Sequence, residues 1–280
     1  TVLPQFSGPN ADNPNDAVVV SLFDGHHIGA VEACALNNRQ GVKDMRKMVP
    51  YVIDQAIKRN ILHGGNLETI AISDNWCMAN TRADDEDLGR LAMGCHIFGR
   101  SELDYNAAAN DGKDSMNNSF TDHKGEVHYI APHLFVASLS ITPDYRRSVS
   151  SFLKRPGNYI YTVGETTDEM GGSIFFYDLG YIGNSIPNTD IKSHVERYRQ
   201  IQQIVQTGIK PDERIVRAVK SIDDGGLAVA AFNMTYHNPV NHGYVGLELD
   251  LENLPRRAQI EDWHALFNEA PGRALFEVPP

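Results

Sequence analysis

Cysteine is scarce in this sequence and poorly placed for cross-linking. The 280 residues include three cysteines, Cys34, Cys77 and Cys95, with no CxxC pair among them. An odd and scattered set of this kind predicts neither a disulfide framework nor a cysteine-rich zinc site. The sequence also opens without a signal-peptide pattern, so we expect a protein of the reducing cytoplasm.

Long apolar runs and an excess of basic residues are missing as well. No run approaches the ~18 apolar residues that a membrane-spanning helix needs, so we expect no membrane partner. Acidic residues outnumber basic ones, 36 against 25, and give a formal net charge of -11. Such a surface repels the backbone of nucleic acid, so nucleic acid is not an expected partner either. Any anionic ligand must be held by local geometry.

What remains is the composition of an ordinary folded protein, with 41% hydrophobic and 22% charged residues. Strand-like and helix-like segments alternate along the chain without a short repeat, which predicts an α+β or mixed α/β fold in two domains. We place the domains at 17–144 and 145–280, after a linker or lead-in strand at 1–16 that carries three prolines. Strands are expected at 17–23, 68–74, 127–141, 158–165, 242–251 and 273–278; helices are expected at 49–62, 84–109, 190–208 and after Gly225–Gly226.

The stretch "NDGKDSMNNSF" (110–120) concentrates small, polar and charged residues in what we expect to be a loop. Gly112 allows a positive φ that would let backbone N–H groups converge on an anion. Lys113 could neutralise a phosphate, while Asp114 and Asn117 offer the oxygen ligands that magnesium prefers. The alternative is a polar surface turn, and the stretch lacks the GxxxxGK[ST] frame of a Walker loop.

A second candidate is "AISDNWCMAN" (71–80), where Asp74 stands at the tip of an expected strand. Ligand sites of α/β proteins collect polar groups at such tips. Trp76 and Met78, which follow, are equally compatible with a role in the core.

Two further stretches join acids to glycine pairs. One is "VGETTDEMGGSIFF" (163–176), with Glu165, Asp168 and Glu169 before Gly171, Gly172 and Ser173; the other is "IDDGGLAVA" (222–230), with Asp224 before Gly225 and Gly226. Acids could hold a metal ion beside N–H groups that hold a phosphate at a helix start. A solvated acidic hairpin and an ordinary helix N-cap are the alternatives.

Together these stretches resemble a known family. "DNWCMAN", "GKDSMNN", "GETTDEMGGS", "DDGGLAVA" and "LFNEAPGRALFEV" occur in the order and spacing of the second half of the phosphoribosylformylglycinamidine synthase family. That family is part of the aminoimidazole ribonucleotide synthase superfamily. The resemblance runs from Val18 to Pro280 and so covers nearly the whole chain.

The resemblance implies an A domain, whose sheet pairs with a second A domain into a β-barrel, followed by a B domain. It implies ATP and Mg²⁺ as cofactors and the conversion of formylglycinamide ribonucleotide, with ammonia derived from glutamine, to formylglycinamidine ribonucleotide. Asp74 and Gly112 match positions that contact ATP, Ser115 matches a substrate contact, and Asp114 is a candidate metal ligand. By the internal symmetry of the fold, the stretches at 163–176 and 222–230 are expected to line an auxiliary nucleotide site.

The sequence also departs from the family pattern. The catalytic histidine segment of the first half has no counterpart, because His26 and His27 lie in "FDGHHIGA" without its asparagine or proline. No cysteine stands in a glutaminase nucleophile elbow, and relatives continue beyond "LFEVPP" to finish the B domain. We therefore expect part of an enzyme, without catalytic residues of its own and inactive alone. It would need the first half and a glutaminase as partners, and would form a homodimer when isolated.

Two alternatives remain open. The chain could be a free-standing homodimeric kinase of the same superfamily, similar to thiamine monophosphate kinase or selenophosphate synthetase. Residues 1–16 lack the glycine-rich or lysine–cysteine segment that those enzymes carry near their start. The other alternative is a non-catalytic domain that pairs through its sheet and holds a nucleotide only for stability.

Overall fold

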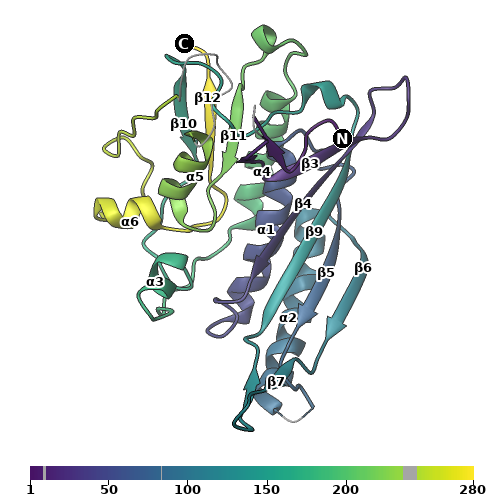
Figure 1. Ribbon diagram of the computed structural model, residues 1–280, viewed down its shortest axis with the longest axis vertical. Coiled ribbons are helices and arrows are strands. Elements are labelled where there is room, and N and C mark those ends of the chain that lie inside the picture. Colours follow the sequence, from purple (N-terminus) through teal and green to yellow (C-terminus); the bar gives the residue numbers. More distant parts are fainter. Residues whose placement is uncertain (9–10, 83, 236–244) are drawn as a thin grey trace.

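The computed structural model describes residues 1–8, 11–82, 84–235 and 245–280, which form two sheets with helices packed against them (Figure 1). The larger sheet has the strand order β3–β4–β9–β5–β6 and the smaller one the order β10–β12–β11. The strands of the larger sheet are β3 (Ala17–Ser21), β4 (Gly29–Asn37), β9 (His133–Thr142), β5 (Ala71–Cys77) and β6 (Ala109–Ser115). Those of the smaller sheet are β10 (Tyr159–Val163), β12 (Ala274–Val278) and β11 (Ala218–Ser221).

The helices and two short hairpins complete the fold. The helices are α1 (Met45–Leu62), α2 (Asp85–Tyr105), α3 (Ile174–Asp178), α4 (Ile191–Val205), α5 (Gly226–Thr235) and α6 (Asp262–Phe267). Two 3₁₀ turns are Tyr145–Arg147 and Pro211–Glu213. The small strands are β1 (Phe6–Ser7), β2 (Asn13–Pro14), β7 (Ser119–Thr121) and β8 (Val127–Tyr129).

One face of the larger sheet is covered and the other is open. In β4, Val31, Ala33 and Ala35 are buried on the inner face, whereas Leu36 on the opposite face is 44% exposed. Leu139 of β9 is likewise 39% exposed. This alternation follows from the two-residue period of a strand. Helices α1 and α2 pack against the inner face (Figure 1), so within the described residues the apolar outer face has no cover.

Helix α1 is the central element of the core. Asp44 caps its start by accepting from the N–H of Arg46, and almost every residue after Met45 is buried. It contacts β4, β9, α2, α4 and also β11 of the smaller sheet. A helix buried on all sides in this way carries no solvent-facing stripe, so its polar residues must find partners inside the protein.

The larger elements confirm most of the sequence expectations, and the fold class is the expected mixed α+β. Among the strands not foreseen are β4, the short β7, and β6, which occupies much of the stretch expected to be a loop at 110–120. The strand expected at 242–251 is wrong for residues 245–251, which join no ladder; residues 242–244 lie outside the described part. Residues 245–251 lack a neighbouring strand in register, so alternating leucines alone did not produce pairing.

The N-terminal segment, expected to be a linker or lead-in strand, is packed against the rest of the protein. Leu3 is buried and bridges to Val19, and Asn13 donates to the carbonyl of Asn233 at 2.5 Å. All three cysteines are free. Within the described ranges, none of the helices combines the length and the apolar character required to cross a bilayer.

Candidate functional site

The residues matched to ATP contacts lie side by side on the last two strands of the larger sheet. Strands β5 and β6 are parallel, and Asp74 stands directly opposite Gly112. Further along the same ladder, Trp76 faces Asp114 and Cys77 faces Ser115. Two segments separated by all of α2 therefore present their polar residues along one edge.

A glycine is needed at position 112 because a side chain there would collide with Asp74, and not because the backbone adopts a left-handed conformation. A Cβ atom at this position would lie 2.8 Å from Oδ1 of Asp74, because the aspartate side chain extends over the glycine. The positive φ expected from the sequence is not adopted, since Gly112 is in an extended strand outside the left-handed region. This glycine lets the Asp74 carboxylate approach the β6 backbone closely.

The charges on this edge interact. Partial burial raises the pKa of the Asp74 carboxyl, and the negative charge of Asp114 raises it further. Lys113 donates from Nζ to the hydroxyl of Ser115 on the exposed outer strand. The two carboxylates lie on one face of this accessible edge, and the amine and hydroxyl lie on the other, because side chains alternate along a strand; the carboxylate pair suits a bound cation.

The stretches expected to form an auxiliary nucleotide site also converge, at the junction between the two sheets. The carboxylate of Glu269, which is 1% exposed, accepts at Oε1 from the N–H groups of Ile174 and Gly225 at 2.8 Å each. These N–H groups stand at the starts of α3 and α5. A side chain of the protein therefore occupies the place where backbone donors would otherwise hold an external anion.

The neighbouring glycine loop uses its N–H groups internally. Gly171 donates to the carbonyl of Ser185 and Gly172 to that of Ile182, both at 2.7 Å, and Ser173 donates to Met170. Gly172 has φ +74°, and a Cβ there would lie 2.4 Å from Cγ of Gln40. The loop thus packs tightly against the segment that precedes α1.

Arg39 connects that segment to the acids. Its Nε donates to the carbonyl of Gly172 at 2.8 Å, and its Nη2 lies 2.6 Å from Asp224 and 3.5 Å from Glu269. Asp224 takes the closer contact with the guanidinium. Burial and the charge of Asp224 raise the pKa of Glu269 to about 7, so the weaker pairing with Arg39 does not compensate Glu269 fully.

Two of the predicted acids lie at the periphery of this junction. Glu165 forms a 2.5 Å ion pair with Arg257, and both side chains are exposed. Asp168 is exposed near His264, whose pKa is lowered mainly by burial. Neither carboxylate points to a shared metal position with Asp224 among the described residues.

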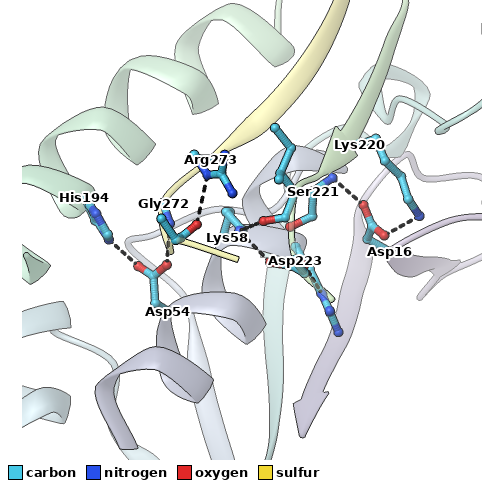
Figure 2. A network of polar contacts seen from close by, with 12 residues as sticks. Asp16, Asp54, Lys58, His194, Lys220, Ser221, Asp223, Gly272 and Arg273 are labelled. Carbon is cyan, nitrogen blue, oxygen red and sulfur yellow. Dashed lines mark hydrogen bonds and ion pairs between the residues drawn. The ribbon is translucent and has the colours of Figure 1, made fainter. Parts of the chain in front are cut away.

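A buried network of ion pairs at the same junction was not foreseen from the sequence (Figure 2). Lys58 and Arg59 of α1 reach Asp223 at 2.7 and 2.8 Å. Burial opposes the ionisation of Asp223, but the two cations outweigh it and hold its pKa below the ordinary value. Adjacent, Lys220 pairs with Asp16 at 2.5 Å. The available signal was the pair of adjacent basic residues near the end of α1, a helix that is buried along most of its length.

Asp54 of α1 forms the second part of that network. Its Oδ1 accepts from Nδ1 of His194 at 2.8 Å and from the hydroxyls of Tyr105 and Tyr198 at 2.7 and 2.8 Å. Its Oδ2 accepts from the N–H of Gly272 at 3.1 Å. Figure 2 shows the contacts to His194 and Gly272. Asp54 thereby connects α2, α4 and the turn before β12 to α1.

A groove of about 880 Å³ lies elsewhere, between β10 and the extended residues 245–251. Leucines form much of its wall, and none of the residues matched to ligand contacts lines it. The polar groups converge instead at the β5–β6 edge and at the junction between the two sheets.

The fold of this chain is similar to that of two solved structures. The structure of T. maritima PurL complexed with FGAR superposes with a TM-score of 0.69 and 17% identity, over 95% of this chain and 40% of that one. AaThiL complexed with AMPPCP and TMP, from Aquifex aeolicus, gives a TM-score of 0.61 and 14% identity over 95% of this chain and 79% of that one.

Sequence comparison finds PurL subunits among the relatives of this chain. The phosphoribosylformylglycinamidine synthase subunit PurL of Nocardioides sp. is 25% identical and that of Renibacterium salmoninarum 26%, each over 95% of this chain. No protein-family profile matches the chain. The chain is thus similar to PurL in sequence and in fold, which confirms the resemblance found in the motifs. It spans 32% of the length of these two relatives.

Proposed function

We propose that this chain is the ATP-contacting second half of a PurL-type phosphoribosylformylglycinamidine synthase, an ATP-dependent carbon–nitrogen ligase of purine biosynthesis. The observation that carries the proposal is the pairing of Asp74 with Gly112 on the accessible β5–β6 edge. Those are the two positions that the resemblance matches to ATP contacts, and they are 38 positions apart in the sequence.

In this proposal each residue of the edge has a role. The carboxylate of Asp74 and the backbone at Gly112 contact ATP, and the hydroxyl of Ser115 contacts formylglycinamide ribonucleotide. Asp114 and Asp74 offer oxygen ligands that fit Mg²⁺, which when bound would neutralise phosphate charge. The electrostatic coupling of the two carboxylates supports a cation there, because a cation would relieve their repulsion.

The auxiliary site is proposed to act as structural support. Glu165, Asp168, Gly171, Gly172, Ser173, Asp224, Gly225 and Gly226 were matched to it. Glu269 accepts the N–H groups at two helix starts, and Arg39 neutralises Asp224. The protein's own ion pairs thus take the positions that a nucleotide and its cation would need.

The partners in this proposal follow from the open sheet face. A first half would cover it in the intact enzyme and supply the catalytic histidines, and a glutaminase would supply ammonia. Alone, the chain is expected to pair with a second copy and to make no product. Leu139→Arg, on the open face, should convert a sedimenting dimer into a monomer; a parent chain already monomeric at tens of micromolar contradicts the pairing.

The test of the ATP role is Gly112→Val, assayed with the separately produced first half and ammonia. The added side chain collides with Asp74, so the Michaelis constant for ATP should rise sharply while the melting temperature stays close to that of the parent. Gly99→Ala is the matched control, because its Cβ meets a single distant atom at 3.9 Å. An unchanged ATP dependence refutes the proposed contact.

A second candidate is a free-standing kinase. It is favoured by one observation, the alignment of this chain with 79% of AaThiL, which is a far larger share than for PurL. Thiamine monophosphate-dependent ATP consumption by the isolated chain would support the kinase; ATP consumption that needs the first half would support the synthase.

A further inference from the structure

A small hairpin separate from the proposed nucleotide edge carries a set of metal-ligand side chains. Strands β7 and β8 pair antiparallel, with Phe120 opposite His128, at the end of the molecule where Figure 1 labels β7. The N–H of Asp122 donates to the carbonyl of Glu126 at 2.9 Å and extends the pairing by one position. Side chains two residues apart share a face of a strand, so 120, 122, 126 and 128 lie on one face.

Three of these four side chains bring donor atoms together. Asp122, Glu126 and His128 each offer one ligand atom, and all three atoms lie within 4.8 Å of one another. Oδ2 of Asp122 is 3.2 Å from Nε2 of His128. Small side-chain rotations would bring donors gathered this closely to one ion at the usual coordination distance of about 2.0–2.2 Å.

The neighbouring contacts hold two of the ligands in place. Oδ1 of Asp122 accepts from the N–H groups of Lys124 and Glu126 at 2.9 Å each, which leaves Oδ2 directed at the cluster. The ring of His128 stacks on Phe120 with centroids 4.8 Å apart and planes 18° apart. Fixed second partners of this kind orient ligands and raise metal affinity.

The negative charges on the hairpin also favour a bound cation. Asp122 and Glu126 are opposite each other across the hairpin, an arrangement in which two like charges destabilise the pairing. A divalent cation bound by both would remove this repulsion. Imidazole favours zinc, nickel or copper over magnesium and calcium, whereas carboxylates accept either class.

We propose that the hairpin binds one divalent transition-metal ion, of the Zn²⁺ or Ni²⁺ type, through Asp122, Glu126 and His128. Water fills the remaining coordination positions, because the three ligands come from one exposed side. The competing arrangement is a metal-free hairpin in which protonated His128 pairs with Asp122. The proposed metal site is independent of the proposed synthase activity.

The experiment is calorimetric titration of the whole chain with Zn²⁺ alone, at pH 7.5 with millimolar Mg²⁺ present. We expect one site that Mg²⁺ does not block, and about 100-fold weaker binding in Glu126→Gln and in His128→Ala, because each removes a direct ligand. His123→Ala, in the same hairpin turn, is the control and should bind like the parent. The ¹⁵N signal of His128 Nε2 should shift on saturation in the parent.

Equal Zn²⁺ affinity in the parent, Glu126→Gln and His128→Ala would overturn the proposal. So would saturation without a shift of the His128 signal, because the ion would then sit on other histidines. Glu126→Gln changes charge without changing shape, so a circular dichroism spectrum like that of the parent separates lost ligation from lost folding.

Discussion

Asp54 gives the sharpest test of how the two sheets are held together. Burial alone would raise its pKa, but the charge and hydrogen bond of His194, the charge of Lys58 and the hydrogen bond from Tyr105 lower it from 3.8 to about 2. This difference corresponds to about 2.4 kcal/mol in favour of the ionised form. Asp54→Asn removes that charge and places an amide N–H₂ against the N–H of Gly272. We expect a loss of roughly 3 kcal/mol, near the low end for breaking a buried charged pair.

The pH dependence has a definite sign. Because the folded-state pKa is the lower one, the stabilisation by Asp54 is complete above its ordinary pKa of 3.8 and disappears as the pH falls toward 2. Urea unfolding of the parent and Asp54→Asn should therefore differ by roughly 3 kcal/mol at pH 7, and the difference should shrink below pH 4. At neutral pH the melting temperature should fall by roughly 6–10 °C.

Two other substitutions serve as controls for the Asp54→Asn measurement. Asp104→Asn removes an exposed carboxylate of the same helix that supplies Tyr105 and should change stability by less than about 0.5 kcal/mol. Tyr105→Phe deletes one of the four hydrogen bonds and should cost about 1 kcal/mol. If Asp54→Asn costs no more than Tyr105→Phe at neutral pH, the buried carboxylate does not hold the junction and the reasoning fails.

Three further substitutions test a buried carboxyl group and the packing of α2. Glu269 has its pKa raised from 4.5 to about 7, so its ionisation is disfavoured in the folded chain and stability is lost as pH rises through that range. Glu269→Gln should gain about 3 kcal/mol over the parent between pH 4.5 and pH 8, and a stability difference that does not vary with pH contradicts this. Gly94→Ala places a Cβ 2.8 Å from the Trp76 ring and should cost roughly 1–3 kcal/mol. Gly89→Ala in the same helix meets nothing within 4 Å and should instead stabilise by up to about 1 kcal/mol; melting temperatures that move the same way would exclude the packing account.

Composition and periodicity predicted the major helices and most strands because those elements bury apolar residues at regular spacing. Strand β4 was missed since its inward residues are mainly alanines, whose small size gives a weak alternating signal. Strand β6 was missed for a different reason. It is the edge strand, exposed for most of its length, so nothing in its packing requires apolar residues.

The site could be predicted only in part. The motifs identified Asp74 and Gly112, and the fold brings them together, but the sequence could not show that the aspartate side chain covers the glycine. The partners of Asp223 are more than 160 positions away on α1. Such pairings depend on how two sheets pack on a shared helix, and a helical pattern in one sequence contains no information about them.

The burial of α1 between both sheets has a consequence for how the protein folds and unfolds. Asp54, Lys58 and Arg59 lie on α1, which packs against the larger sheet, and have partners at His194 of α4 and at Asp223, which follows β11. If either sheet opened alone, it would leave these charges uncompensated in a low-dielectric setting. Opening one sheet should therefore cost nearly as much as opening both, so local opening is suppressed and amide exchange in α1 should follow global unfolding. Cutting the chain near residue 145 should thus yield two pieces that fail to fold separately and recover structure when mixed.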